Sequence, residues 1–247
     1  MKVCRYVPFE RFTDVVEKNA LYFVNPFKHW EDQKEGFLFR FAKDIQNQDE
    51  LECLVKQLNL VAGKEKNIIN QIIRGNIADE AGTELDWFGM RCQSWCKSID
   101  DLNMWTLYSK KGCDICYITD TNKLCSLCHN NSAVEGFDVI YKTELSALEV
   151  LKKSVKKSGS MFVFPAILQY KHSNFSVENE YRVYTLESNK GQLNGIEVPV
   201  DIPIDSFVEG VYCSPDSTAN FRAKVKDYCN NNKLVFCQST ARSSSES

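Results

Sequence analysis

The order of short apolar runs constrains the fold of this chain more than any other feature of its sequence. It opens as strand, helix, strand, with "VCRYV", "FTDVVEKN" and "ALYFV". Later strand-like runs are "RCQSWCK", "CDICYIT", "FDVIY", "PAILQY", "EYRVYTLE", "GIEVPV", "FVEGVYCS" and "LVFCQS", and helical patterns cover about 145–157 and 218–230. Strands and helices do not alternate regularly, so the sequence predicts an α+β fold with a mixed, mostly antiparallel sheet rather than a doubly wound one.

The length of 247 residues and a hydrophobic content of 43% are enough for one sizeable core. We expect a single globular domain over residues 1–240. From residue 44 to about 80 apolar residues recur at helical spacing, which predicts a helical insertion broken near Ala62 and Gly63. The polar end of the chain, 241–247, is expected to be a disordered tail.

Charge and apolar patterning limit the classes of partner. The net charge of −3 gives no overall basic surface for nucleic acid or an anionic membrane. No segment approaches the roughly 18 continuous apolar residues of a membrane span, and the first residues carry no export signal. We therefore expect a cytoplasmic protein without a membrane partner, in which the eleven cysteines are mostly reduced.

Two Cys-x-x-Cys pairs lie in "CDICYITDTNKLCSLCH", residues 113–129. A zinc site and buried thiols are the two interpretations, since haem attachment requires export. Cys113 and Cys116 fall on opposite faces of a strand-like run, whereas Cys125 and Cys128 fit one face of a short helix beside aliphatic residues. The gap between the pairs is also short for zinc, so we favour buried or half-buried thiols and expect no metal.

Polar residues that interrupt apolar strands are the stronger candidates for a site, because their burial requires partners or a ligand. Arg5 interrupts the first strand and suits either an anionic ligand or an internal ion pair. Glu178, Glu180 and Arg182 follow at intervals of two, which on a strand places them on one face. The cation would relieve the repulsion between the carboxylates, so this row fits the floor of a polar cleft or an exposed ion-paired face.

Aromatic residues gather in two further segments. Trp30 stands in the turn-rich loop "NPFKHWEDQKEG", which could line a cleft or cap a helix. Met104, Trp105 and Tyr108 share helical spacing, for which packing into the core is favoured over a wall that stacks on bases.

Taken in order, "CRYVPF", "LYFVNPFKHWEDQKEG", "CQSWCKSIDDLNMWTLYSKKG", "FDVIYK" and "KHSNFSVENEYRV" resemble a bacterial family known as domain-of-unknown-function family 2971. The resemblance extends over nearly the whole chain. Val24 stands where the family usually has serine, and Gln33-Lys34 stands where it usually has Pro-Phe. The family pattern is in turn similar, at the level of the fold, to the ADP-ribosyltransferase layout.

That second resemblance implies roles for particular residues. In the ADP-ribosyltransferase layout an early arginine or histidine holds NAD, and a late glutamate stabilises an oxocarbenium-like transition state. Arg5 would take the first role and Glu180 the second, with Glu178 assisting activation of the nucleophile. Tyr22 and Trp30 would pack near the ligand.

Arg182 is also expected to bind the cofactor, together with Arg5, Tyr22 and Trp30. The implied function is an NAD-consuming, ADP-ribosyltransferase-like enzyme that modifies protein or nucleic acid, with bacterial defence against phage or toxin action as its setting. NAD would be its substrate, without a metal.

Two other functions remain open on the sequence. Clustered carboxylates at Asp32, Glu35, Glu178 and Glu180 also suit a divalent metal in a nuclease. A non-catalytic module that binds a ligand or a protein through its aromatic and acidic residues is the third possibility.

Overall fold

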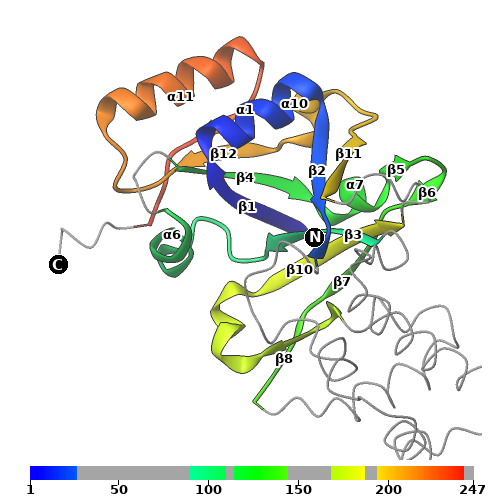
Figure 1. Cartoon of the computed structure of the whole chain (residues 1–247). Helices are drawn as coiled ribbons and strands as arrows, with labels where there is room; N and C mark the ends of the chain where they lie inside the picture. Colours follow the sequence, from blue (N-terminus) through cyan, green and yellow to red (C-terminus); the bar gives the residue numbers. More distant parts are fainter. Residues whose placement is uncertain (27–89, 110–113, 144–167, 187–193, 242–247) are drawn as a thin grey trace, which may run out of the picture.

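The computed structural model describes residues 1–26, 90–109, 114–143, 168–186 and 194–241 (Figure 1). Within these ranges the fold is α+β, with a mixed sheet core and several helices, which confirms the predicted fold class. The expected helical insertion at 44–80 and the expected helix at 145–157 lie outside the described residues, as does the expected tail after residue 241.

The chain begins as predicted, with β1 (Lys2–Pro8), α1 (Phe9–Lys18) and β2 (Ala20–Val24). The middle of the chain contributes β3 (Met90–Cys96), α6 (Leu102–Tyr108), β4 (Asp114–Asp120), α7 (Thr121–Cys125), β5 (Cys128–His129), β6 (Ser132–Ala133), β7 (Glu135–Asp138) and β8 (Ile140–Lys142). The remainder contributes β9 (Tyr170–His172), the 3-10 helix η2 (Ser173–Glu178), β10 (Glu180–Leu186), β11 (Gly195–Pro199), α10 (Ile204–Phe207), β12 (Gly210–Cys213), α11 (Ala219–Asn231) and β13 (Phe236–Cys237).

The main sheet has the strand order β11-β2-β3-β1-β4-β12-β13, and β10 and β7 continue it from β3 on a branch. Its described strand pairs are antiparallel except β12 with β13. β1 pairs with β4 along its whole length, and β10 does so with β3. Between β1 and β3, by contrast, the described residues share one register pair, Cys4 with Cys96. We call this narrow junction the strand seam.

The two faces of β1 contribute to different cores. Val3 and Val7 lie with residues of α1, α10 and α11 in the larger core, whereas Cys4 packs with Met104 and Trp105 of α6 in a smaller one. This division follows from the alternation of side chains along a strand. The helices α1, α10 and α11 thus cover one side, and α6 covers the other (Figure 1).

The second Cys-x-x-Cys pair corrects one prediction. Helix α7 ends at Cys125, and Cys128 already belongs to the short strand β5. Both thiols are exposed, while Leu124 and Leu127 fill the core instead. Because the helix stops after one turn, the shared helical face that would have buried the two thiols does not form.

Only one cysteine of the first Cys-x-x-Cys pair belongs to the described residues. Cys116 is buried beside Cys4 and Cys96 in the smaller core, as the strand pattern predicted, and Cys113 lies outside the described residues. Within the described ranges there is no group of three or more metal-ligating side chains.

Candidate functional site

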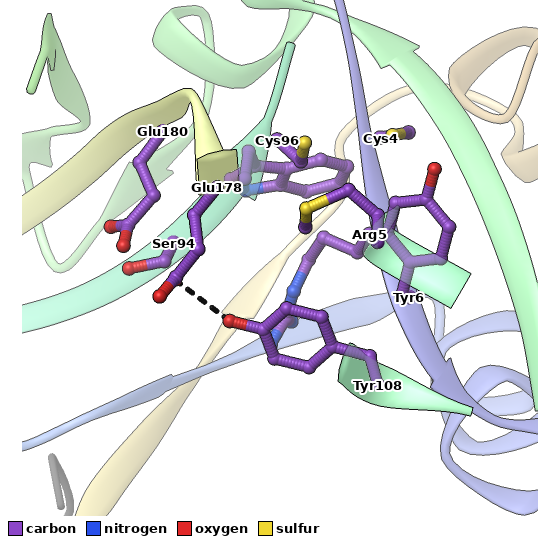
Figure 2. Close-up of a pocket in the computed structure, with 10 residues that line it drawn as sticks. Cys4, Arg5, Tyr6, Ser94, Cys96, Tyr108, Glu178 and Glu180 are labelled. Carbon is purple, nitrogen blue, oxygen red and sulfur yellow. Dashed lines mark hydrogen bonds between the residues drawn. The ribbon is translucent and has the colours of Figure 1, made fainter. Parts of the chain in front are cut away.

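A cavity of about 150 Å³ lies at the strand seam (Figure 2). Its lining consists of Cys4, Arg5, Tyr6, Ser94, Trp95, Cys96, Met104, Tyr108, Glu178 and Glu180. Successive side chains on a strand point to opposite faces, yet three consecutive residues of β1 and three of β3 line this one space. Such a lining is possible because the two strands part beyond their single register pair. We call this space the seam cavity.

A compact network of charges forms one side of the seam cavity. Lys171 Nζ donates to Glu180 Oε1 at 2.6 Å and to Glu178 Oε2 at 3.1 Å, so one ammonium group bridges the two carboxylates. Arg182 Nε donates to Glu180 Oε2 at 2.6 Å, and its Nη1 donates to the carbonyl of Leu168 at 2.6 Å. All four charged side chains are at least mostly buried. Their ion pairs are therefore only weakly screened by water.

The same network separates the pKa values of the two carboxyls. Burial alone would raise the pKa of Glu180, but Arg182 and Lys171 outweigh it and lower this pKa to about 2. Burial raises the pKa of Glu178, and the adjacent Glu180 adds to the rise, whereas Lys171 and Tyr108 oppose it. Two neighbouring carboxyls with pKa values displaced in opposite directions are a typical arrangement for acid–base chemistry.

Helix α6 brings Tyr108 to the mouth of the seam cavity. Its N-cap, Asp101, accepts hydrogen bonds from the backbone N–H groups of Asn103 and Met104. The Asp101 N–H in turn donates to the hydroxyl of Tyr6 at 2.9 Å, which ties the start of the helix to β1. At the other end, Tyr108 Oη donates to Glu178 Oε2 at 2.8 Å (Figure 2).

The predicted aromatic helix is therefore confirmed, with one difference. Met104 and Trp105 are buried in the core, as favoured, but Tyr108 is 45% exposed and lies beside the cavity.

Arg5 supplies a further cation. Its Cζ lies 5.9 Å from the centre of the Trp95 ring, within the range of a cation–π contact. Within the described ranges Arg5 forms no ion pair, so the internal-pair interpretation of this residue finds no support there. The buried indole N–H of Trp95 likewise has no acceptor among the described residues.

The expected site residues divide into three groups. Arg5, Glu178 and Glu180 line the seam cavity together, and Arg182 contacts Glu180 from beside the lining. Tyr22 lies on β2, 41% exposed, and is not part of the lining. Trp30 lies outside the described residues.

The predicted row of three residues on one strand face is partly wrong. Glu180 and Arg182 do share a face of β10, but Glu178 ends the 3-10 helix η2. Asn179 between them has a φ of 44°, in the left-handed region, and it ends η2 directly before β10 begins. Glu178 nevertheless reaches the cavity because this turn folds η2 back toward α6.

Sequence reasoning missed Lys171 as the cation that joins the carboxylates. The need for a cation was evident from two acidic side chains close together, but Lys171 belongs to β9, a short strand that pairs with β8. Ser94, which faces Arg182 across β3 and β10, was also not assigned a role.

The described residues thus form an α+β protein in which buried, ion-paired carboxylates lie at a cavity between two parts of a sheet. The model of a family described as "Protein of unknown function (DUF2971)" matches residues 104–183, about a third of the chain. The match includes most of α6, all of β4, and Glu178 and Glu180, and it confirms the family resemblance over this segment.

Other comparisons add no named relative. No curated protein and no solved structure matches the chain. The ADP-ribosyltransferase resemblance stays a prediction. Among the helices of the described part, none has the length and apolar character needed to cross a membrane.

Proposed function

We propose that the chain is an NAD-consuming enzyme of the ADP-ribosyltransferase type, acting in the cytoplasm on a protein or nucleic-acid acceptor. The observation that carries this proposal is the convergence of Arg5, Glu178 and Glu180 on the seam cavity. Arg5 comes from β1, far in the sequence from η2 and β10, the two neighbouring elements that carry Glu178 and Glu180. Their meeting supports the roles that the fold-level resemblance implied.

The charges at the cavity suit a ligand with an anionic pyrophosphate and a ring. When ionised, Glu178 and Glu180 are balanced by Lys171 and Arg182. Arg5 then adds one positive charge beside the cavity, and its planar group suits bidentate contact with a phosphate. A whole dinucleotide is much larger than about 150 Å³, a volume that accommodates roughly one aromatic ring. We therefore assign this cavity to the reacting end of NAD.

The proposed reaction breaks the bond between nicotinamide and ribose. Nicotinamide leaves with the electron pair of that bond, and positive charge develops on the ribose. The ionised Glu180, held in place by two cations, stabilises this charge as a preorganised electrostatic group. The acceptor nucleophile then forms a bond to the ribose carbon, and its proton passes to Glu178, whose raised pKa suits a base.

Release of nicotinamide from labelled NAD tests the proposal. Candidate acceptor proteins and nucleic acids are included, and wild type is compared with Glu178→Gln and Glu180→Gln. We expect a loss of roughly 100-fold or more in both variants, because each removes a charged group from the reacting centre. Glu197→Gln is the matched control, since Glu197 is exposed and pairs with Lys18 on the surface.

The proposal fails if wild type releases no nicotinamide with any acceptor, or if Glu180→Gln retains wild-type turnover. Circular dichroism of each variant separates loss of chemistry from loss of fold.

One observation favours a second candidate, a binding module without turnover. Both oxygens of Glu180 already accept hydrogen bonds from cations, which is also what a structural ion pair requires. In that case Arg5 and the aromatic rings would hold an anionic ligand, and NAD would raise the melting temperature without being consumed. The pairing of both glutamates with Lys171 does not favour the metal-dependent nuclease, and Asp32 and Glu35 lie outside the described residues.

A further inference from the structure

A second, larger cavity lies between α11 and the C-terminal segment. Its volume is about 920 Å³. Residues of α11, the turn after β12 and residues 234–241 line it. Figure 1 shows the C-terminal segment, in red, returning below α11. We call this space the C-terminal cavity.

The two charged side chains that line the C-terminal cavity are both cations. Arg222 and Lys226 lie one helical turn apart on α11, and both line the cavity. No aspartate or glutamate belongs to the lining; the acidic residues nearest in sequence, Asp216 and Asp227, are not part of it. Arg222 Nη2 donates to the carbonyl of Pro215 at 2.5 Å, which fixes the guanidinium while leaving its other N–H donors available.

The wall opposite α11 is preformed. Asp100 accepts hydrogen bonds from Ser239 Oγ at 2.7 Å and from the N–H groups of Thr240 at 2.7 Å and Ala241 at 3.3 Å. The indole N–H of Trp105 also donates to Asp100, at 2.9 Å. A carboxylate with several donors holds the C-terminal segment firmly against α6. The cavity therefore exists without a ligand to order it, which lowers the entropic cost of binding.

The uncharged part of the lining suits a flat, polar ring. Phe236 is half-buried and offers an apolar surface, and Asn230 and Gln238 each provide an amide that can both donate and accept. Aromatic stacking together with amide contacts is a common way in which proteins hold a nucleobase. The volume also lies in the range of sites that take small organic ligands.

We propose that the C-terminal cavity binds a phosphate-bearing ligand of nucleotide size. Arg222 and Lys226 hold the phosphate, and Phe236, Asn230 and Gln238 surround the base. This site is separate from the seam cavity, and the inference does not rest on the proposed function. The same phosphate chemistry is offered by a free nucleotide and by a single strand of nucleic acid. The cavity is bounded on two sides, by α11 and by the C-terminal segment, which favours the free nucleotide.

Isothermal titration calorimetry of the full chain at low ionic strength tests this site. The probes are adenosine monophosphate, inorganic phosphate and a short single-stranded oligothymidylate. We expect the mononucleotide to bind more tightly than phosphate, and the double variant Arg222→Ala/Lys226→Ala to weaken its binding by at least about tenfold. Lys224→Ala is the matched control, because Lys224 lies on the same helix with its Nζ over the ring of Phe9, 5.2 Å from its centre. It should change the affinity by less than about twofold.

Any of four results would overturn the inference. One is the absence of binding by the mononucleotide to wild type, and another is equal affinity in wild type and the double variant. The third is binding of the oligothymidylate alone, which would make this face a nucleic-acid surface instead. An Arg5→Ala variant serves to separate the two cavities: binding lost there but kept in the double variant would assign the mononucleotide to the seam cavity and contradict the C-terminal site.

Discussion

The two cavities hold their cations in different surroundings. At the seam cavity Lys171 and Arg182 are nearly inaccessible, and each contacts a carboxylate at 2.6 Å. At the C-terminal cavity Arg222 and Lys226 are exposed on one helix, with no carboxylate in the lining. The first pair of cations stabilises acidic side chains of the same chain, whereas the second pair is available to an external anion.

This difference separates the residues that stabilise the fold from the residues that can bind a ligand. A buried charge that loses its partner is costly, because water cannot solvate it, so the loss of one member of the network at the seam cavity should destabilise the fold. Exposed lysines and arginines contribute little to folding, because water already solvates them. Substitutions at the seam cavity should therefore change the free energy of unfolding, whereas substitutions at the C-terminal cavity should change the affinity for a ligand.

The largest effect is expected for Lys171→Met. It leaves Glu178 and Glu180 without their shared cation, and the free energy of unfolding should fall by about 3–5 kcal/mol. Urea denaturation measures the change. Lys18→Met is the control, since Lys18 pairs with Glu197 at 2.5 Å on the open surface and its loss should leave the urea midpoint nearly unchanged. Equal shifts for the two variants would contradict the distinction between buried and exposed pairs.

Acid should destabilise the protein mainly by protonating Glu180 at the seam cavity. The pKa of Glu180 lies at about 2 in the folded state, below its ordinary value of 4.5. A lowered pKa stabilises the fold above the ordinary value, and that stabilisation disappears as the pH falls toward the folded-state pKa. Between pH 5 and pH 3 this carboxyl should account for a loss of about 2 kcal/mol in the free energy of unfolding.

Urea denaturation at a series of pH values, with wild type and Glu180→Gln side by side, isolates this contribution. The variant should be less stable at pH 7 and should lose less stability on acidification. Parallel pH profiles for the two proteins would show that Glu180 is not the responsible group.

A smaller effect is expected for Tyr108→Phe. The variant loses the hydrogen bond from Tyr108 Oη to Glu178, at a cost of about 1 kcal/mol in unfolding free energy. The pKa of Glu178 should rise further, because this hydrogen bond opposes the rise that burial causes. Carboxyl chemical shifts followed against pH measure the pKa. Tyr228→Phe is the control, since the buried hydroxyl of Tyr228 has no partner among the described residues and its removal should not destabilise the protein.

The smallest effect on stability is expected for Lys226→Ala in the C-terminal cavity. Its free energy of unfolding should differ from wild type by less than about 0.5 kcal/mol, because the side chain is exposed. Urea denaturation and mononucleotide titration on the same sample measure both properties. A substantial loss of stability would mean that Lys226 has a structural role and would remove the contrast between the cavities.

Local patterns predicted much of the described fold. The opening strand, helix and strand were predictable because Phe9, Phe12 and Val16 recur on one helical face between two apolar runs. The shared face of Glu180 and Arg182 followed from the two-residue period of a strand.

What the sequence did not reveal depends on single backbone turns and on distant contacts. The left-handed Asn179 removes Glu178 from the strand, and α7 ends one turn too early to bury Cys125 and Cys128. The bridging role of Lys171 depends on the pairing of β8 with β9, which no local period encodes.

The single register pair at the strand seam has a consequence for what holds the sheet together. β1 pairs with β4, and β3 pairs with β10, along whole strands, but Cys4 and Cys96 form the one register pair between β1 and β3 within the described residues. Side chains supply further contacts: Tyr6 Oη donates to the carbonyl of Ser98 at 2.9 Å, and the rings of Trp95 and Tyr117 lie 5.4 Å apart. Around Arg5 and Glu180, therefore, the two parts of the sheet are joined more by side-chain packing than by a ladder of backbone hydrogen bonds.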